Sequence, residues 1–265
     1  MARGYNVHAN GIRHHLLHFA GAGPTMLLIP GITSPAVTWG FVAERLAAAF
    51  DVHVLDVRGR GLSEAGALDY SLDAMAADAV ALVEAAGLGR PVVLGHSMGA
   101  RIAIRAARRS PGAFSGLLLI DPPVSGPGRR PYPSAWNWYE DSILLARKGC
   151  SGEDMRRFCP TWTDEQNALR AEWLHSCQLD AVRAAYDGFH TDDIHADLPH
   201  LALPMRLVVA GGAAVIGNED IEEIRTLAPA IETRIVEKAG HMIPWDDLEG
   251  FLAAVMDFRP LVDKN

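Results

Sequence analysis

The sequence predicts an α/β fold, with a mostly parallel sheet, helices on both faces and one helical insertion. Short apolar runs of strand length alternate with alanine-rich amphipathic runs of helix length along the 265-residue chain. Continuously apolar strands are typical of parallel sheets that helices cover on both sides. The alternation stops between Pro122 and about His200, where no strand pattern is evident. A chain of this length accommodates one large domain with such an insertion.

The first half of the chain contains four predicted strands that alternate with three predicted helices. Pro30-Gly31 ends the first of these strands, and Gly87 ends the second helix because glycine readily takes the left-handed conformation there. A strand that resembles half of a hairpin precedes them near the N-terminus. The four strands are Thr25–Ile29, Val52–Asp56, Pro91–Leu94 and Leu117–Ile120, and the helices are Phe41–Ala49, Asp73–Ala86 and Ala100–Ala107.

The insertion and the remainder of the core follow. We expect residues 1–121 and 201–265 to form the core and residues 122–200 to form a helical lid. The insertion holds four of the six tryptophans and all three cysteines. Aromatic residues at that density favour a lid over a pocket, and the alternative is that they form the insertion's own core. The predicted lid helices are Trp138–Lys148, Asp164–Cys177 and Leu179–Phe189; the core resumes with strand Leu207–Ala210, helix Asp220–Leu227, strand Ile231–Val236 and helix Leu248–Phe258.

Composition and charge exclude several classes of protein. The chain has 24 lysines and arginines against 32 acidic residues, a net charge of −8, and no long basic run that would bind nucleic acid. Three widely spaced cysteines without a CxxC pair argue against a disulfide framework or a thiolate zinc site. No apolar signal segment or membrane span is evident. We expect a cytoplasmic protein without a membrane partner, and the sequence leaves its oligomeric state open.

The segment Gly95-His96-Ser97-Met98-Gly99 is the most informative motif. It has the form G-x-S-x-G, directly after a predicted strand and directly before a predicted helix. A serine on such a sharp turn projects its hydroxyl from the sheet edge, and the flanking glycines permit the strained backbone. The alternative, a glycine-rich turn that binds phosphate, lacks the lysine and the length of a P-loop. The motif therefore predicts Ser97 as a nucleophile.

A serine nucleophile requires a base and an acid that orients the base. Among eleven histidines, His241 lies in the loop after the strand Ile231–Val236, at the carboxyl edge of the sheet. His96 adjoins Ser97, but we expect its side chain to point away. Asp121 ends the strand Leu117–Ile120 at the same edge. The alternative acid is Asp220, although it resembles an ordinary acid in the first turn of a helix.

Two backbone amides are candidates for an oxyanion hole. One is the N–H of Met98, directly after the nucleophile. The other is the N–H of Ile32, in the loop Pro30-Gly31-Ile32-Thr33-Ser34-Pro35 that follows the first parallel strand. The alternative for that loop is an ordinary Pro-Gly turn. The histidines His14, His15 and His18 form a cluster without a carboxylate nearby in sequence, so we expect solvated strand residues there and no metal site.

These motifs resemble the α/β-hydrolase superfamily, in the same order and over nearly the whole chain. The resemblance rests on Pro30-Gly31, on the segment Asp56-Val57-Arg58-Gly59-Arg60-Gly61-Leu62-Ser63, on the turn at Ser97, on the insertion after Asp121 and on Gly240-His241. It implies an α/β-hydrolase fold with a Ser-His-Asp triad. In such folds Asp56 and Arg58 are expected to brace loops rather than to react.

The lid segments are similar to a narrower family, the N-formylmaleamate deformylases of aerobic nicotinate degradation. The similarity is carried by the segments 121–130, 158–166 and 240–247 and by the loop 30–35. Lids differ between activities while core motifs do not, so the lid segments matter most. The resemblance implies hydrolysis of the formyl amide to maleamate and formate, through a formyl-serine, without cofactor or metal. It also supports an acid at Asp121.

A small anionic amide substrate implies a cation in the pocket. The candidates are Arg129 and Arg130 at the start of the lid and Arg101, one turn past Ser97; the alternative for each is a surface charge or a brace between lid and core. Trp138 and Trp162 are candidate pocket residues, as are Trp136 and Tyr139. Another lidded hydrolase, such as a carboxylesterase or a carbon–carbon bond hydrolase, stays open, as does a ligand-binding receptor on this fold.

Overall fold

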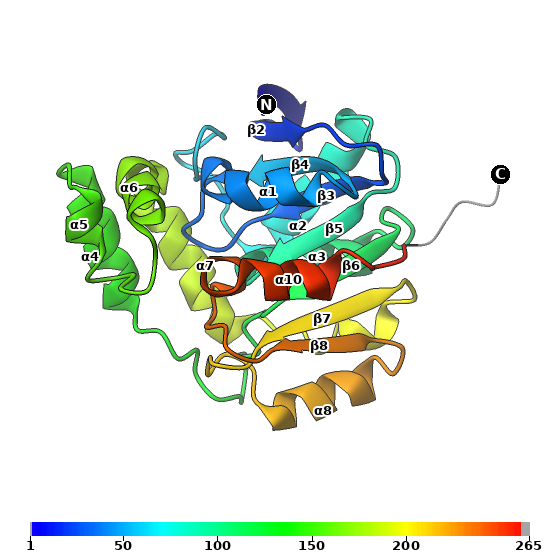
Figure 1. Cartoon of the computed structure of the whole chain (residues 1–265). Helices are drawn as coiled ribbons and strands as arrows, with labels where there is room; N and C mark the ends of the chain where they lie inside the picture. The colour runs from blue at the N-terminus through cyan, green and yellow to red at the C-terminus, as the bar shows by residue number, and fades with distance from the viewer. Residues whose placement is uncertain (1, 261–265) are drawn as a thin grey trace.

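One eight-stranded sheet organises the part of the chain that the structure describes, residues 2–260 of a computed structural model. The strand order is β1-β2-β4-β3-β5-β6-β7-β8 (Figure 1). β1 (Arg3–Ala9), β2 (Ile12–Phe19) and β4 (Asp51–Asp56) pair antiparallel, and Asn10 and Gly11 form the hairpin turn with φ values of 48° and 78°. The other pairings are parallel; they join β4 and the strands β3 (Thr25–Ile29), β5 (Val92–His96), β6 (Gly116–Ile120), β7 (Met205–Ala210) and β8 (Glu232–Val236).

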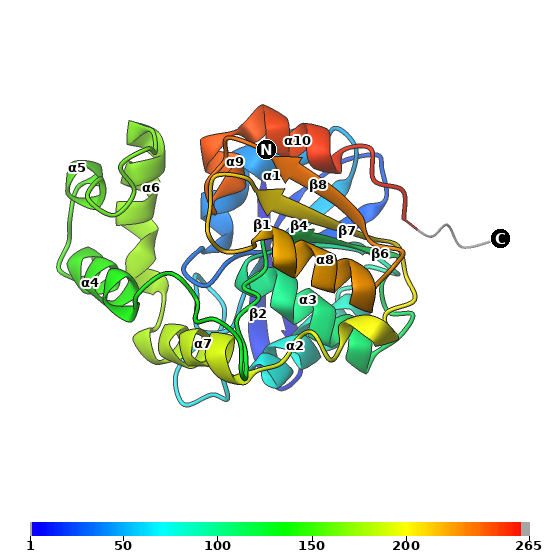
Figure 2. The ribbon, with the colours of Figure 1, turned by 90° about the horizontal axis from the view of Figure 1, so that it is seen from below.

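Side chains from the parallel strands alternate between two apolar clusters, one on each face of the sheet. Leu27, Val93 and Leu119 belong to the cluster beneath α2 (Leu72–Ala85), α3 (Met98–Arg109) and α8 (Asn218–Leu227). Leu28 and Leu94 belong to the opposite cluster, beneath α1 (Gly40–Leu46) and α10 (Leu248–Val255) (Figure 2). Both faces are buried, which explains why the strands are continuously apolar. The expected layering of helices on both faces is confirmed.

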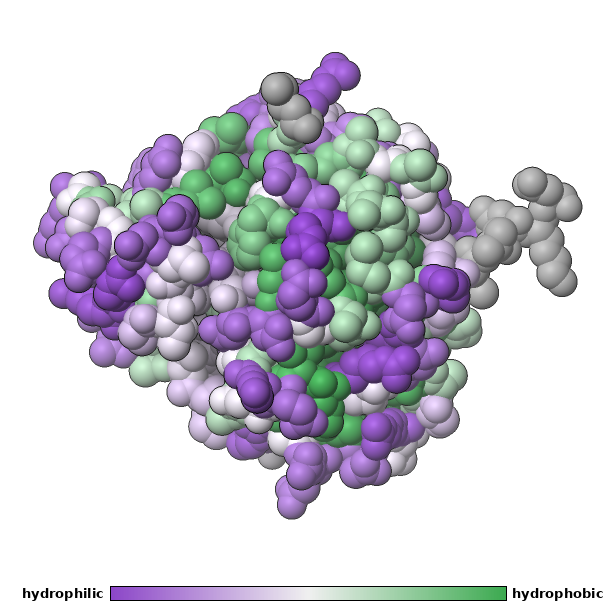
Figure 3. Space-filling view, viewed as in Figure 1, coloured by the Kyte–Doolittle hydropathy of each residue, from purple (hydrophilic) through white to green (hydrophobic). Residues whose placement is uncertain are grey.

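The insertion between β6 and β7 lies beside the core and packs against it. Its helices are α4 (Trp136–Arg147), α5 (Gly152–Met155), α6 (Asp164–Trp173) and α7 (Leu179–Thr191) (Figures 1 and 2). Capping boxes at Ser151 and Thr163 begin α5 and α6. Apolar lid residues such as Ile143 and Phe189 share a cluster with the core, and hydrophilic residues predominate on the side of the lid that Figure 3 shows. The division at residues 122–200 stays a prediction.

Several element ends differ from the sequence expectation. α1 stops at Leu46 rather than Ala49, because the chain turns there to enter β4, and α10 stops at Val255 rather than Phe258. α6 ends at Trp173 and continues as the 3₁₀ turn η2 (Leu174–Ser176). The single-turn elements α5, α9 (Ile243–Asp246), η1 (Ala36–Trp39) and η3 (Leu198–His200) were not expected, since one turn shows no periodicity. None of the helices in residues 2–260 is long and apolar enough to cross a bilayer.

Two glycines allow α3 to start directly after β5. A Cβ on Gly95 would lie 2.3 Å from the carbonyl oxygen of Gly99. A Cβ on Gly99 would lie 1.9 Å from the carbonyl oxygen of Ile29 and 2.8 Å from that of Pro30. These neighbours are backbone atoms, which cannot move aside as a flexible side chain can. The turn between β5 and α3 therefore requires glycine at both positions.

We expect Gly99→Ala to lower the free energy of unfolding by about 3 kcal/mol or more, the upper range for overpacking of a rigid interior. Gly40→Ala is the matched control: its Cβ would meet only Cζ of Phe19 at 3.9 Å, and Gly40 has helical φ and ψ of −53° and −48°. The control is expected to change stability by less than about 1 kcal/mol. Urea denaturation followed by circular dichroism measures both. Equal midpoints for the two variants would contradict the steric argument.

Candidate active site

Ser97 lies on the turn between β5 and α3 in a strained backbone conformation. Its φ and ψ are 54° and −116°, in the positive-φ region that side chains other than glycine rarely adopt. The backbone N–H of Ser97 donates to the carbonyl of Ile120 at 2.8 Å, which ties the turn to β6. Only 2% of Ser97 is exposed. Its hydroxyl is thus held at the carboxyl edge of the sheet, as the G-x-S-x-G pattern predicts.

His241 connects the hydroxyl of Ser97 to a buried carboxylate. The Nε2 atom of His241 is 3.0 Å from Oγ of Ser97, and its Nδ1 atom is 2.7 Å from Oδ2 of Asp121. A carboxylate only accepts hydrogen bonds, so Nδ1 carries the proton toward Asp121 and the lone pair of Nε2 faces the hydroxyl. The second oxygen of Asp121 accepts the backbone N–H of Ala210 at 3.2 Å. The structure therefore brings together Ser97, His241 and Asp121.

The alternative acid, Asp220, lies away from His241. It accepts the N–H of Gly217 at 2.7 Å at the start of α8 and pairs with Arg130. This is the role of an acid in the first turn of a helix. Asp121 is fully buried at the end of β6, with a φ of 44° that turns the chain out of the sheet. Only Asp121 of the two candidates reaches the histidine.

Two backbone amides beside Ser97 are without a hydrogen-bond acceptor. Within residues 2–260 the N–H groups of Ile32 and Met98 donate to no other group of the protein. The loop of Ile32 approaches the serine closely, because a Cβ on Gly31 would lie 3.5 Å from Cβ of Ser97. Arg60 braces the same loop by donating from Nε to the carbonyl of Ile32 at 3.2 Å. Free amides in this position are suited to a developing oxyanion.

Asp56 and Arg58 brace loops, as the superfamily resemblance implies. Asp56 accepts the N–H of Ala36 at 2.6 Å and contacts Nδ1 of His15 at 2.8 Å. Arg58 donates from Nε and Nη2 to the two oxygens of Asp78, both at 2.5 Å. Neither residue lines the cavity at Ser97.

A cavity of about 290 Å³ opens at Ser97 between the core and the lid. Core loops supply one wall and the lid supplies an aromatic wall. Trp138 and Trp162 line the cavity with Tyr139, whereas Trp136 does not. The thiol of Cys159 also lines it, and burial raises the pKa of that thiol, so the cysteine stays protonated. The full lining comprises Gly31, Ile32, Thr33, Ser34, His96, Ser97, Tyr132, Ser134, Trp138, Tyr139, Phe158, Cys159, Pro160, Thr161, Trp162, Arg170, His241, Met242 and Asp246.

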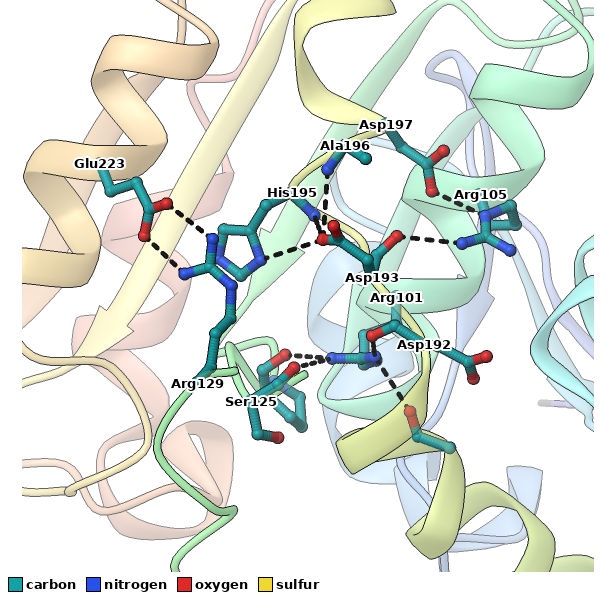
Figure 4. A network of polar contacts seen from close by, with 12 residues as sticks. Arg101, Arg105, Ser125, Arg129, Asp192, Asp193, His195, Ala196, Asp197 and Glu223 are labelled. Carbon is teal, nitrogen blue, oxygen red and sulfur yellow. Dashed lines mark hydrogen bonds and ion pairs between the residues drawn. The ribbon is translucent and has the colours of Figure 1, made fainter. Parts of the chain in front are cut away.

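The expectation that Arg101, Arg129 or Arg130 provides the pocket cation is wrong in this structure, since none of the three lines the cavity. Arg101 is buried and donates to four backbone carbonyls: Pro123 at 2.7 Å, Ser125 at 3.0 Å, Asp192 at 2.7 Å and Gly188 at 3.2 Å (Figure 4). Arg129 makes two bonds of 2.6 Å to Glu223, and Arg130 donates to Asp220 and to the carbonyls of Ala214 and Val215. Their donors join the two ends of the lid to the core.

Arg170 is the arginine that does line the cavity. It lies on α6, is 5% exposed and stacks over the rings of Trp138 and Trp162 at 5.1 and 5.7 Å from their centroids. The sequence contains no motif that distinguishes it from the other lid arginines. Only the packing of the lid against the core shows which arginine faces inward.

Tyrosine and histidine side chains surround the triad. The hydroxyl of Tyr132 is 3.4 Å from Nε2 of His241. The hydroxyl of Tyr139 donates to the hydroxyl of Tyr132 at 3.3 Å. His96 donates from Nε2 to the carbonyl of His241 at 2.9 Å rather than to Ser97. Burial and the nearby His241 lower the pKa of His96 to about 3, so it is neutral at physiological pH and anchors the histidine loop. The sequence showed none of these contacts.

The expectation that the N-terminal histidines are solvated is wrong for His14 and His15, which are 0% and 8% exposed, and all three histidines lie near carboxylates that are distant in sequence. His15 contacts Asp56 at 2.8 Å and His18 contacts Asp51 at 2.7 Å, because β2 pairs with β4. His14 lies 3.6 Å from Asp78 of α2. The group His18, Asp51 and His53 has ligand atoms within 4.8 Å of one another, a geometry that could hold a metal ion. It lies where β4 begins, at the opposite end of the strands from Ser97.

Comparisons with known proteins identify the family of this chain. A model described as the alpha/beta hydrolase family matches residues 26–254. The chain is 59% identical over 262 residues to N-formylmaleamate deformylase of Pseudomonas putida (strain KT2440), covering 98% of each protein. The crystal structure of the N-formylmaleamic acid deformylase from Pseudomonas putida S16 has a TM-score of 0.94 and 68% identity, covering 96% of this chain and 100% of that one.

A solved E-2-(acetamidomethylene)succinate hydrolase has a TM-score of 0.79 at 21% identity, with 97% of this chain and 99% of that chain covered, and shares the fold. The family model matches most of the chain, and the matched range 26–254 contains Ser97, Asp121 and His241. The chain belongs to the alpha/beta hydrolase family.

Proposed function

We propose that this hydrolase cleaves the formyl amide bond of N-formylmaleamate and releases maleamate and formate. The observation that carries the proposal is the 59% identity to N-formylmaleamate deformylase over 98% of both proteins. That match includes the lid, whose side chains select what enters the cavity. The near-complete superposition on a second deformylase, with a TM-score of 0.94, supports the same activity. The substrate is a small organic amide that carries a carboxylate.

The first half of the proposed reaction transfers the formyl group to Ser97. Nε2 of His241, 3.0 Å from Oγ of Ser97, takes the hydroxyl proton as Oγ attacks the formyl carbon. The negative charge that develops on the formyl oxygen is stabilised by the N–H groups of Ile32 and Met98. His241 then returns the proton to the amide nitrogen, the carbon–nitrogen bond breaks and maleamate leaves. Ser97 carries a formyl ester.

Water completes the proposed cycle. His241 takes a proton from a water molecule that attacks the formyl ester, and the same two amides stabilise the second tetrahedral oxyanion. The proton returns to Oγ of Ser97 and formate leaves. Asp121, 2.7 Å from Nδ1, stabilises the imidazolium that forms in both halves and keeps the imidazole in the required tautomer. Water is the only co-reactant that the steps need, so the proposal includes no cofactor or metal.

Ser97→Ala tests the nucleophile. Formate release from N-formylmaleamate, measured with a formate dehydrogenase-coupled assay, is expected from the wild type. We expect the variant to lose kcat by roughly 10⁶-fold, the loss seen when a serine nucleophile is removed. Hydrolysis of p-nitrophenyl acetate is measured in parallel. Rapid ester cleavage by the wild type without formate release would reject the deformylase proposal, and tight ligand binding without any turnover would favour a receptor.

Asp121→Asn tests the acid, with Asp220→Asn as the matched control. An amide at position 121 no longer stabilises the imidazolium and favours the wrong tautomer, so we expect kcat to fall by about 10⁴-fold. Asp220 pairs with Arg130 outside the cavity, and its replacement is expected to change kcat by less than about threefold. Formate release by both purified variants measures the effect. A larger loss for Asp220→Asn would refute the assignment.

A further inference from the structure

We propose that Arg170 is the anion-binding residue of the cavity and that it holds the carboxylate of the substrate; the identity of that substrate rests on the proposed function. Arg170 is 5% exposed and lines the same cavity as Ser97. Its Nε and Nη2 atoms are buried and have no hydrogen-bond partner among residues 2–260. Buried guanidinium donors without acceptors are costly. An anionic ligand would supply the missing acceptors.

The aromatic wall holds the guanidinium in place. Arg170 lies over Trp138 and Trp162, at 5.1 and 5.7 Å from the ring centroids. Trp138 is anchored by its Nε1, which donates to the carbonyl of Phe158 at 3.3 Å, and Trp162 is stacked on Trp245 at 5.3 Å. These contacts hold Cζ of Arg170 over both rings, while Nε and Nη2 have no acceptor among residues 2–260. A carboxylate can accept from such a pair of donors through two parallel hydrogen bonds.

The other buried arginines have protein acceptors. Arg101 donates to four backbone carbonyls, and Arg60 donates to the carbonyls of Ile32, Arg58 and Ala181. Within the described residues, Arg170 forms no ion pair with a carboxylate. Asp246 also lines the cavity, but its oxygens accept from the N–H of Gly240 at 2.9 Å and from the hydroxyl of Thr161 at 3.3 Å. Arg170 therefore differs from Arg60 and Arg101, whose donors are taken up by carbonyls of the protein itself.

A ligand class follows from the two ends of the cavity. Ser97 and His241 define the reacting end, and Arg170 on α6 provides positive charge on the lid side. A cavity of about 290 Å³ suits a small molecule with a scissile acyl group and a carboxylate at its other end. The whole chain carries a net charge of −8 and repels anions at long range, so a local cation is needed to hold such a molecule.

Arg170 also lines a second cavity, with Thr38, Gln166 and Trp245. The two cavities share Ser34, Trp162 and Arg170. An anion bound to Arg170 from the second cavity would leave the space at Ser97 free for a neutral ester, so it would not compete with that ester. Competitive inhibition of ester hydrolysis by an anion therefore indicates binding in the cavity at Ser97, and noncompetitive inhibition indicates binding in the second cavity. The proposal requires competition with substrate at the triad.

Arg170→Gln and Arg170→Lys test the proposal, with Arg157→Gln as the matched control. Arg157 is another lid arginine stacked on an aromatic ring, 4.7 Å from the centroid of Phe158, but it is exposed and does not line the cavity. We expect Arg170→Gln to lower kcat/KM for N-formylmaleamate by about a hundredfold, mainly through KM, because a buried charge partner is lost. Arg170→Lys should recover part of that loss. Hydrolysis of neutral p-nitrophenyl acetate should change less than about threefold in Arg157→Gln, and in Arg170→Gln it should fall at least about tenfold less than hydrolysis of N-formylmaleamate does.

A measurement on the wild type keeps the test valid if the variants do not fold. Maleamate is expected to inhibit ester hydrolysis competitively and at least about tenfold more strongly than its neutral diamide, since only maleamate offers a carboxylate to Arg170. Equal inhibition by the two compounds, noncompetitive inhibition, or an unchanged kcat/KM for N-formylmaleamate in Arg170→Gln would overturn the proposal.

The outcomes separate this proposal from the proposed function. If the wild type releases no formate but maleamate inhibits ester hydrolysis and Arg170→Gln abolishes that inhibition, the anion site stands and the deformylase activity is rejected. If the wild type releases formate and Arg170→Gln does so with equal kcat/KM, the activity stands and the role of Arg170 is rejected.

Discussion

The close approach between the start of α3 and the end of β3 is the constraint on which the site depends. The backbone at Gly99 lies so near the Ile29 carbonyl that a Cβ would be 1.9 Å from its oxygen. This contact lets α3 begin directly after β5 and leaves Ser97 with a φ of 54°. It also places the loop of Ile32 beside the serine. The strain at one residue is offset by the surrounding sheet and helix, which hold the turn in a single conformation.

Buried charge is the second feature that organises the molecule. Arg101 and Arg60 are each 1% exposed and donate to backbone carbonyls, so they join segments that are distant in sequence. Burial lowers the pKa of both groups to about 10, and both keep their charge at physiological pH. Arg170 differs because it lines a cavity and two of its buried donors have no acceptor among residues 2–260. A buried arginine thus stabilises the fold where backbone carbonyls surround it, and it is available to a ligand where no carbonyl accepts its donors.

The sequence predicted the sheet, its layers and the three residues that meet at the carboxyl edge. Strand and helix patterns gave the order of elements, and the edge rule for parallel strands grouped Ser97, Asp121 and His241. It did not predict which arginine faces the cavity. Arg101 lies one turn past Ser97, which suggested a ligand contact, but four carbonyls from the lid ends take up its guanidinium. Proximity in sequence to a nucleophile says little about which way a helical side chain points.

The sequence by itself determined the fold class, the order of the elements and the position of the nucleophile, because these depend on local patterns: apolar periodicity, glycine spacing and strand ends. The tertiary structure alone decided the contacts between distant segments. His15 meets Asp56 through strand pairing, His96 meets the carbonyl of His241 across the site, and Arg170 turns inward because of how the lid packs. Such contacts depend on long-range packing, and no local pattern in one sequence encodes them.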